Sequence, residues 1–234
     1  MTERARPVAL AGGRALVTGA SSGIGAATAR SLTTDGVAVA LAGRDADALA
    51  AVAAQTGGPA FAGDLTEAEY PARLVAEAAA ALGGLDIVVC NAGVGWCGSF
   101  RDMDPAAIDK LIDLNLRAPA HLLRAAVPAL VAKGRGHLVL VGSIAGLVGV
   151  ANEVVYSATK AGLGGLAGAL RAELAGTGVK VTLISPGVVD TAFFSRRNRP
   201  TTAAGRRRSP PARSPTPSST ASASGDPRPS SRPG

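Results

Sequence analysis

Short apolar segments alternate with longer segments of helical pattern between residues 14 and 185. Several apolar segments run directly into glycine, which is typical of buried strands that end in turns. The expected strands are Arg14–Gly19, Val37–Ala42, Pro59–Ala62, Leu85–Cys90, His137–Gly142 and Val179–Ser185. Such alternation favours right-handed βαβ units. We therefore expect one α/β domain with a doubly wound parallel sheet and helices on both faces, and 234 residues suffice for its core.

A glycine-rich turn follows the first expected strand, and a helical pattern follows the turn as far as Asp35. Glycines let a backbone approach a pyrophosphate, and the helix N-terminus offers free N–H groups. The spacing is GxxxGxG rather than GxGxxG, and a lone glycine cluster is often only a turn. Its place at a strand-to-helix junction favours a nucleotide-phosphate site. The candidate residues are Gly19, Ser21, Ser22, Gly23, Ile24 and Gly25.

The second strand ends in Gly43 and Arg44. In dinucleotide-binding folds an acidic residue here binds the adenosine ribose, whereas an arginine accommodates a 2′-phosphate. Gly43 supplies no carboxylate and Arg44 supplies a cation, so NADP(H) is favoured over NAD(H). The alternative is a solvated arginine at the start of a helix.

Polar and small residues also follow the third and fourth strands. Asp64 and Leu65 lie just beyond Ala62, and two roles are open to Asp64: accepting a hydrogen bond from an adenine amino group, or capping a helix that starts near Glu67. The fourth strand runs into Asn91, Ala92 and Gly93, whose small size suits a backbone that lies beside a cofactor.

Ser143, Tyr156 and Lys160 form the candidate chemical centre. Ser143 follows the fifth strand, and Tyr156 and Lys160 are four residues apart in a helical segment, so they share one helix face. A phenol has a pKa of about 10, and a nearby ammonium lowers it toward the working pH. Ser143 can then hold a carbonyl oxygen while Tyr156 moves its proton. The alternative is an ordinary helix with a surface tyrosine and lysine.

Asn115 lies within a long helical region, Asp102 to Lys133, that we expect to be interrupted at Pro119 and Pro128. Asparagine is a weak helix former. Asn115 therefore either points to solvent or marks a kink where its side chain or carbonyl holds water.

Charge and composition exclude several function classes. The net charge is +7, but residues 195–234 hold nine arginines and one aspartate, so the remaining residues carry a net charge of −1. We expect no nucleic-acid partner, because such proteins carry a basic face on the fold itself. No apolar run reaches the roughly 20 residues of a membrane span, and we expect a soluble cytoplasmic protein. Neither the cysteines (Cys90, Cys97) nor the histidines (His121, His137) have metal-ligand spacing, so no metal site is expected.

These motifs, in this order, resemble the short-chain dehydrogenase/reductase family of NAD(P)(H)-dependent oxidoreductases. The resemblance covers residues 10–194. It rests on the segments 18–25 and 91–93, on Asn115, Ser143, Tyr156 and Lys160, and on Pro186, Gly187 and Thr191. It implies a Rossmann fold, a small carbonyl or alcohol substrate, and a homodimer or homotetramer. Tyr156 would be the general acid/base, Ser143 would polarise the carbonyl, Lys160 would bind the nicotinamide ribose, Asn115 would hold a relay water, and Thr191 would contact the carboxamide.

The chain departs from the family after Phe194. Family members continue into a substrate-covering loop, a helix and a last strand, but no Val, Ile, Leu, Met or aromatic residue follows Phe194. We expect a folded domain over residues 1–195 and a disordered tail over 196–234, because such a segment cannot bury enough apolar surface. A frameshift and a genuine basic tail are the two explanations, and the first is favoured.

Three functions compete at this point. The first is an NADP(H)-dependent oxidoreductase acting on a carbonyl or a secondary alcohol. The second is a catalytically weak NADP(H)-binding protein without a substrate lid, and the third is a nucleic-acid-associated protein that uses its tail. The complete set Asn115, Ser143, Tyr156 and Lys160 favours the first.

Overall fold

The computed structural model describes residues 10–187, and all of them belong to one unit. Thr191 and the expected tail at 196–234 lie outside the described residues. The described part holds one parallel sheet, as expected, and its strand order is β3-β2-β1-β4-β5-β6. Its strands are β1 (Arg14–Thr18), β2 (Ala38–Gly43), β3 (Ala60–Ala62), β4 (Ile87–Cys90), β5 (Gly136–Val141) and β6 (Val179–Ile184).

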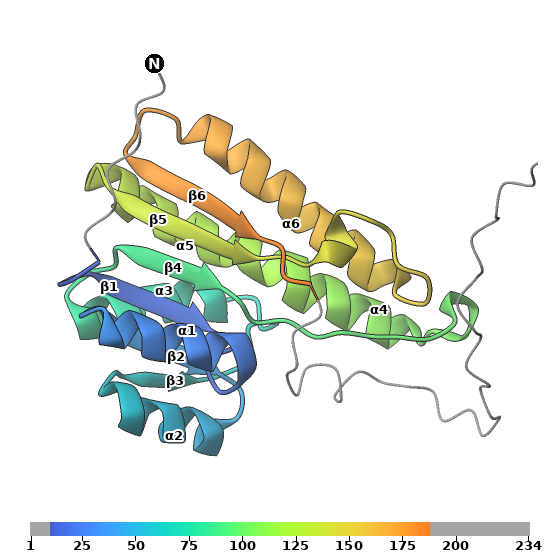
Figure 1. Ribbon diagram of the computed structural model, residues 1–234, viewed down its shortest axis with the longest axis horizontal. Coiled ribbons are helices and arrows are strands. Elements are labelled where there is room, and N and C mark those ends of the chain that lie inside the picture. Colours follow the sequence, from blue (N-terminus) through green and yellow to red (C-terminus); the bar gives the residue numbers. More distant parts are fainter. Residues whose placement is uncertain (1–9, 188–234) are drawn as a thin grey trace, which may run out of the picture. The chain divides into compact units, whose positions relative to one another are not determined.

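Helices connect these strands and cover both faces of the sheet (Figure 1). They are α1 (Gly23–Thr34), α2 (Ala46–Thr56), α3 (Tyr70–Leu82), α4 (Pro105–Ile112), α5 (Ala118–Ala132) and α6 (Val154–Glu173). Two short 3₁₀ turns, η1 (Phe100–Asp102) and η3 (Ile144–Gly146), and one π-helical turn, η2 (Asp113–Arg117), complete the described elements.

Successive residues of β1, β2, β4 and β5 pack into two separate cores. Leu16, Val88 and Leu138 pack with residues of α3, α5 and α6. Their neighbours Val17 and Val89 pack with residues of α1 and α2 on the opposite face. This alternation follows from the two-residue side-chain period of a strand, and it explains why the strands read as continuous apolar runs.

The order in which the chain adds strands to the sheet reverses beside β1. That strand pairs with β2 on one side and with β4 on the other, so the chain crosses over between β3 and β4. A reversal of this kind opens a crevice at the carboxyl ends of the central strands, which is where ligands bind in open α/β sheets.

The expected break of the long helical region at its prolines is wrong. Pro119 lies in the first turn of α5 and Pro128 lies inside it, and α4, η2 and α5 follow one another without a gap. The irregularity is the π-helical turn around Asn115, in which Ala118 N–H donates to Asp113 O. Pro119 explains its position, because a proline has no N–H for the carbonyl four residues earlier and its ring clashes with that carbonyl.

The suggestion that Asp64 caps the next helix is also wrong. That helix, α3, begins at Tyr70 rather than near Glu67, and its N-cap residue is Glu69. Asp64 Oδ1 instead accepts hydrogen bonds from the N–H and the hydroxyl of Thr66, at 2.9 and 2.8 Å. The aspartate thus closes a local turn, which competes with helix formation.

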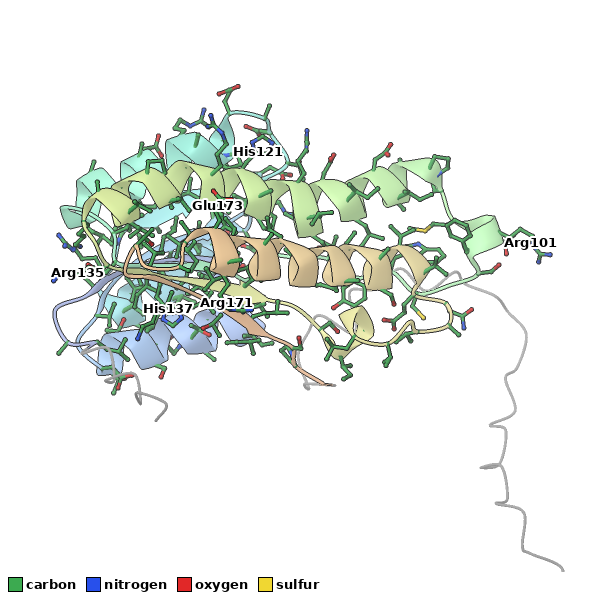
Figure 2. The ribbon with its side chains drawn as sticks, turned by 90° about the horizontal axis from the view of Figure 1, so that it is seen from above. Arg101, His121, Arg135, His137, Arg171 and Glu173 are labelled. Atoms are coloured by element: carbon green, nitrogen blue, oxygen red, sulfur yellow. The ribbon has the colours of Figure 1, made fainter. Side chains whose placement is uncertain are left out.

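Arg101 and Arg135 lie at opposite ends of the described part of the chain in Figure 2. Arg135 and His137, at the start of β5, lie at the end opposite Arg101 of η1. His137 Nε2 lies 2.7 Å from Thr182 Oγ1, and burial lowers the pKa of His137. His121 is exposed on α5.

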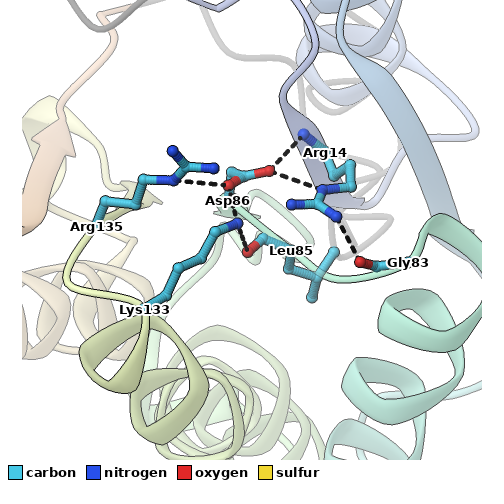
Figure 3. A network of polar contacts seen from close by, with 6 residues as sticks. All are labelled: Arg14, Gly83, Leu85, Asp86, Lys133 and Arg135. Carbon is cyan, nitrogen blue, oxygen red and sulfur yellow. Dashed lines mark hydrogen bonds and ion pairs between the residues drawn. The ribbon is translucent and has the colours of Figure 1, made fainter.

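A charged network joins four segments at the amino ends of the strands (Figure 3). Asp86, just before β4, accepts hydrogen bonds from Arg14 N and Nε at 3.1 and 3.0 Å and from Lys133 Nζ, and Arg135 Nε lies 3.7 Å away. Burial of Asp86 opposes its ionisation, but the contacts with Lys133 and Arg14 outweigh it and lower the pKa of Asp86. The network therefore contributes to the fold only while Asp86 is ionised.

Candidate active site

A cleft of about 380 Å³ lies at the carboxyl ends of the strands, and residues that follow each of the six strands line it. Most of the predicted site residues meet there. They are Gly19, Ser21, Ser22, Gly23, Ile24, Arg44, Leu65, Asn91, Ala92, Gly93, Ser143, Tyr156, Lys160, Pro186 and Gly187. Three predicted residues, Gly25, Asp64 and Asn115, do not line the cleft.

The N-terminus of α1 faces this cleft with its backbone donors uncapped. The N-cap residue Ser22 makes no side-chain hydrogen bond to the helix, and Gly23 and Ile24 of the first turn line the cleft. Asp45 caps α2 and Asp104 caps α4, whereas α3, α5 and α6 lack a side-chain cap as α1 does. The first N–H groups of a helix need partners from outside the helix, and together with the helix dipole they favour an anion.

Gly25 acts through packing rather than by lining the cleft. A Cβ at Gly25 would lie 2.2 Å from Gly19 O, and Gly19 itself has a φ of 66°. Only glycine permits both the left-handed backbone and this close approach. The two residues therefore keep the turn tight against α1.

Thr18 and Asn91 fasten the glycine-rich turn to the loop after β4. Thr18 Oγ1 donates to Val89 O at 3.1 Å and accepts from the N–H groups of Asn91 and Ala92 at 3.0 and 3.2 Å. Asn91 Nδ2 donates to Thr18 O at 2.9 Å. The Asn91 side chain thus positions the cleft walls, and its backbone remains beside the cleft.

Arg44 and Lys110 put two cations at the β2 end of the cleft. Arg44 Nη1 lies 3.8 Å from Asp64 Oδ2, and the Arg44 side chain is 51% exposed. Burial of Asp64 is outweighed by its hydrogen bonds to Thr66 and by the charges of Arg44 and Lys110, so the pKa of Asp64 is lowered. The carboxylate of Asp45 also lies here, but it accepts the Ala48 N–H at the start of α2.

Ser143, Tyr156 and Lys160 meet at the other end of the cleft. Ser143 follows β5, and its hydroxyl oxygen accepts from Ala145 N at 3.2 Å. Lys160 Nζ donates to Val141 O at 2.9 Å and lies 5.8 Å from the centre of the Tyr156 ring. Lys160 is only 6% exposed, and this burial lowers its pKa to about 8. The four-residue spacing predicted that Tyr156 and Lys160 share one helix face, and the structure adds that both are buried.

Asn115 is completely buried and holds the loop after β4 against α6. Its Oδ1 accepts from Val94 N and its Nδ2 donates to Val94 O, both at 2.9 Å. Nδ2 also lies 3.3 Å from Thr159 Oγ1, whose hydroxyl donates to Tyr156 O at 2.8 Å. The Asn115 side chain is thus hydrogen-bonded to protein groups. This leaves the main-chain carbonyl of Asn115 as the remaining candidate for holding water.

Several lining residues were not predicted from the sequence. They are Gly43, Asp45, Gly63, Val94, Gly95, Lys110, Leu114, Val141 and Gly142. Most of them adjoin predicted residues along the chain, so widening each motif by a few positions would have found them. Lys110 is different, because it reaches the cleft from α4 and no local pattern marks it.

The described residues show no other obvious centre. Within 10–187 there is no group of three His, Cys, Asp or Glu that could hold a metal ion, and no helix long and apolar enough to cross a membrane. Cys90 is fully buried in the core, and burial raises its pKa to about 12.

Known proteins share this architecture. A family model described as short chain dehydrogenase matches residues 14–202. The chain belongs to the short-chain dehydrogenase family. Its relatives in this family include an uncharacterized oxidoreductase of Staphylococcus aureus strain MRSA252, which is 41% identical over 187 residues, or 79% of this chain and 81% of that protein.

Solved short-chain dehydrogenase structures agree with the fold. A metagenomic short-chain oxidoreductase in complex with NADP is 44% identical, with a TM-score of 0.72 over 78% of this chain and 85% of that one. A dehydrogenase/reductase from Sinorhizobium meliloti 1021 is 35% identical, with a TM-score of 0.72 over 79% and 76%. The chain is thus an oxidoreductase of this family with a Rossmann-like fold.

Proposed function

We propose that this short-chain dehydrogenase transfers a hydride between NADP(H) and a carbonyl or secondary alcohol, with Tyr156 as the general acid/base. The observation that carries the proposal is the buried Lys160 ammonium beside the Tyr156 ring, in the same cleft as Ser143. Burying a charge costs free energy, so a lysine that is kept buried at a cleft favours a chemical role.

The cleft fits a nicotinamide dinucleotide. The uncapped N-terminus of α1 supplies free N–H donors for a pyrophosphate, and Gly19 and Gly25 keep that turn close to the sheet. Ser21, Ser22, Gly23 and Ile24 would hold the phosphates, and the loop of Asn91, Ala92 and Gly93 would lie along the cofactor. Leu65 would line the adenosine side, while Pro186 and Gly187 would lie at the nicotinamide end. When bound, the nicotinamide would supply or accept the hydride.

The side chains at the chemical end divide the remaining work. Lys160, with a pKa of about 8, is still largely protonated at neutral pH, and its charge favours the ionised form of the neighbouring Tyr156. In reduction, Tyr156 would give its proton to the carbonyl oxygen, and in oxidation it would take the proton from the alcohol. Ser143 would hold the same oxygen by a hydrogen bond.

Asn115 would take part in supplying the proton. The side-chain amide of Asn115 accepts from Val94 N and donates to Val94 O. In an α-helix the main-chain carbonyl of Asn115 would accept from the N–H of residue 119, but that residue is Pro119 and has no N–H. We propose that this carbonyl, at the π-helical turn, holds a water on the route from solvent to Lys160. The side chain would act as a positioning group for the loop after β4.

The β2 end of the cleft favours NADP(H) over NAD(H). Gly43 leaves the end of β2 without a carboxylate, and Arg44 is half-exposed with only a loose contact to Asp64. Its guanidinium can therefore turn to a 2′-phosphate, and Lys110 adds a second positive charge. Asp64 would remain beside the adenosine as the partner that orients Arg44.

Cofactor titration tests this preference. We expect NADPH to bind at least about tenfold more tightly than NADH, which is about 1.4 kcal/mol, and Arg44→Ala to remove most of the difference. Arg124→Ala, an exposed arginine on α5 away from the cleft, is the control. Equal dissociation constants for the two cofactors in the wild type would contradict the proposed preference.

NADPH oxidation over a panel of ketones and aldehydes tests the chemistry. Tyr156→Phe should abolish nearly all turnover and leave NADPH affinity close to that of the wild type, because the phenol acts on the substrate. Lys160→Ala should lose both turnover and affinity. Substantial turnover by Tyr156→Phe would exclude Tyr156 as the acid/base, and binding without turnover in the wild type would favour the catalytically weak alternative.

The domain division belongs to the proposal as well. We propose a catalytic domain over residues 1–195; the family model covers residues 14–202, and the similarity to the Staphylococcus aureus protein spans 79% of the chain. We propose 196–234 as a tail outside the catalytic domain, and a homodimer or homotetramer as the assembly.

A further inference from the structure

Two apolar loops border the Tyr156 end of the cleft. One spans residues 93–100 and the other spans 144–152, and Gly98 N donates to Asn152 O at 2.8 Å between them. Trp96 of the first loop and Val150 of the second pack against the cluster that contains Tyr156. The first loop lines the cleft through Gly93, Val94 and Gly95, and the second loop follows Ser143 directly, so both lie beside the space in which a substrate would meet Ser143 and Tyr156.

Neither loop carries a cation. Within residues 93–100 and 144–152 there is no Lys, Arg, His, Asp or Glu. The neighbouring ionisable groups are Glu153, which is 9% exposed, and the pair Arg101 and Asp102, which is exposed and outside the cleft lining. Figure 2 shows Arg101 pointing outward at the end of the molecule. The cations that line the cleft in the described residues, apart from Lys160, lie at its β2 end.

Large apolar side chains are uncovered beside this space. Ile144 directly follows Ser143 and is 44% exposed, and Leu147 and Val148 are exposed still further along the same loop. Ile144 N donates to Pro186 O at 3.0 Å, which keeps Ile144 at the mouth of the cleft because Pro186 lines it. An apolar surface next to a polar reaction centre suits a ligand with an apolar body and one polar group.

We propose that the substrate is an uncharged ketone or secondary alcohol whose apolar body lies against Trp96, Ile144 and Val150. The inference rests on the proposed function for the location of the reacting carbonyl. Among residues 10–187, a carboxylate or phosphate at this end of the cleft would be taken from water without a cation of the two loops to receive it. Anionic carbonyl compounds of the same shape should therefore be rejected.

The intrinsic fluorescence of Trp96 gives a binding readout that needs no turnover, because Trp96 is the single tryptophan of the chain. Acetophenone and 4-acetylbenzoate are a matched pair, since they share the ketone and the ring and differ in one carboxylate. Each is titrated into the full chain in the presence of excess NADP⁺. We expect acetophenone to change the fluorescence and to bind at least about tenfold more tightly than 4-acetylbenzoate.

A pair of isoleucine variants locates the effect. Ile144→Arg places a cation beside Ser143 at a half-exposed position, and it should shift the affinity ratio toward 4-acetylbenzoate by about tenfold or more. Ile112→Arg makes the same change on α4 at nearly equal exposure, 42% against 44%, and should leave the ratio unchanged. Turnover of both ketones is measured separately with NADPH.

Each outcome decides one of the two proposals. Equal affinities for the two ketones, or no response of Trp96 to either, would overturn the uncharged-substrate inference. An unchanged affinity ratio in Ile144→Arg would also overturn it. If that variant also changed its oligomeric state, the apolar loops would be covered by a second copy of the chain instead of a substrate. Discrimination without turnover would support the inference and contradict the proposed function.

Discussion

At the scale of single residues, the main conflict is the buried charge of Lys160. The residue is 6% exposed, and its burial lowers the pKa to about 8 from the ordinary 10.5. A gap of this size corresponds to roughly 3 kcal/mol of free energy that the folded protein loses by keeping Lys160 charged. A functional side chain that destabilises its own fold is common at active sites.

Replacing this charge should therefore stabilise the cofactor-free protein. We expect Lys160→Met to raise the free energy of unfolding at pH 7 by about 1–3 kcal/mol. The pKa of Lys160 is lower in the folded protein than in the unfolded chain, so the folded wild type loses the Lys160 proton at a lower pH than the unfolded chain does. It recovers stability as the pH rises from about 8 toward 10.5, so the advantage of the variant should shrink over that range.

Denaturant unfolding at several pH values measures this difference. Lys180→Met is the control, because Lys180 is an exposed lysine on β6 and its loss should have little effect. A Lys160→Met variant less stable than the wild type at pH 7 would show that the bond to Val141 O outweighs the burial cost.

At the scale of elements, the contact between η3 and α6 sets the distance from Ser143 to Tyr156. A Cβ at Gly146 would lie 2.6 Å from the carbonyl carbon of Lys160 and 2.7 Å from its oxygen. The turn that follows Ser143 can thus rest directly on the backbone of the helix that carries Tyr156 and Lys160. Both contacts are to backbone, which cannot move aside as a flexible side chain would.

Gly146→Ala should push these two elements apart. We expect a loss of stability of about 1–3 kcal/mol from overpacking and a loss of most NADPH-dependent turnover. Gly149→Ala is the matched control three residues later, because a Cβ there meets nothing within 4 Å. Thermal unfolding and steady-state rates of both variants check the prediction, and equal behaviour of the two alanine variants would contradict it.

At the scale of the whole molecule, Asp86 joins β1, β4, α5 and β5 at the end opposite the cleft. Its side chain is 17% exposed, and its pKa is lowered because the contacts with Lys133 and Arg14 outweigh the burial that raises it. The folded pKa lies below the unfolded one. The stability that Asp86 contributes is therefore present above about pH 4 and is lost as the pH falls through the folded pKa.

Asp86→Asn should destabilise the fold without changing the site. We expect the free energy of unfolding to fall by about 2–4 kcal/mol at pH 7, with a smaller deficit in acid, where the wild type loses the same charge. NADPH affinity should not change. Asp102→Asn, at an exposed pair with Arg101, is the control, and a deficit that stays constant from pH 7 to strong acid would exclude the ionic explanation.

The sequence by itself determined the local features. The strand, glycine turn and helix from Arg14 to Thr34 follow from short-range periodicity and backbone freedom, and Tyr156 and Lys160 share a face because helical geometry repeats every 3.6 residues. The order of the motifs likewise indicated the family, which the comparisons confirm.

Only the tertiary structure decided what those residues contact. Asn115 binds Val94, Lys110 reaches the cleft from α4, and Arg14 meets Asp86 across 72 positions of sequence. Such contacts depend on the strand order that places β1 between β2 and β4, and no local pattern encodes that order. The pKa of Lys160 belongs to the same class, because desolvation is produced by every element that packs around the ammonium.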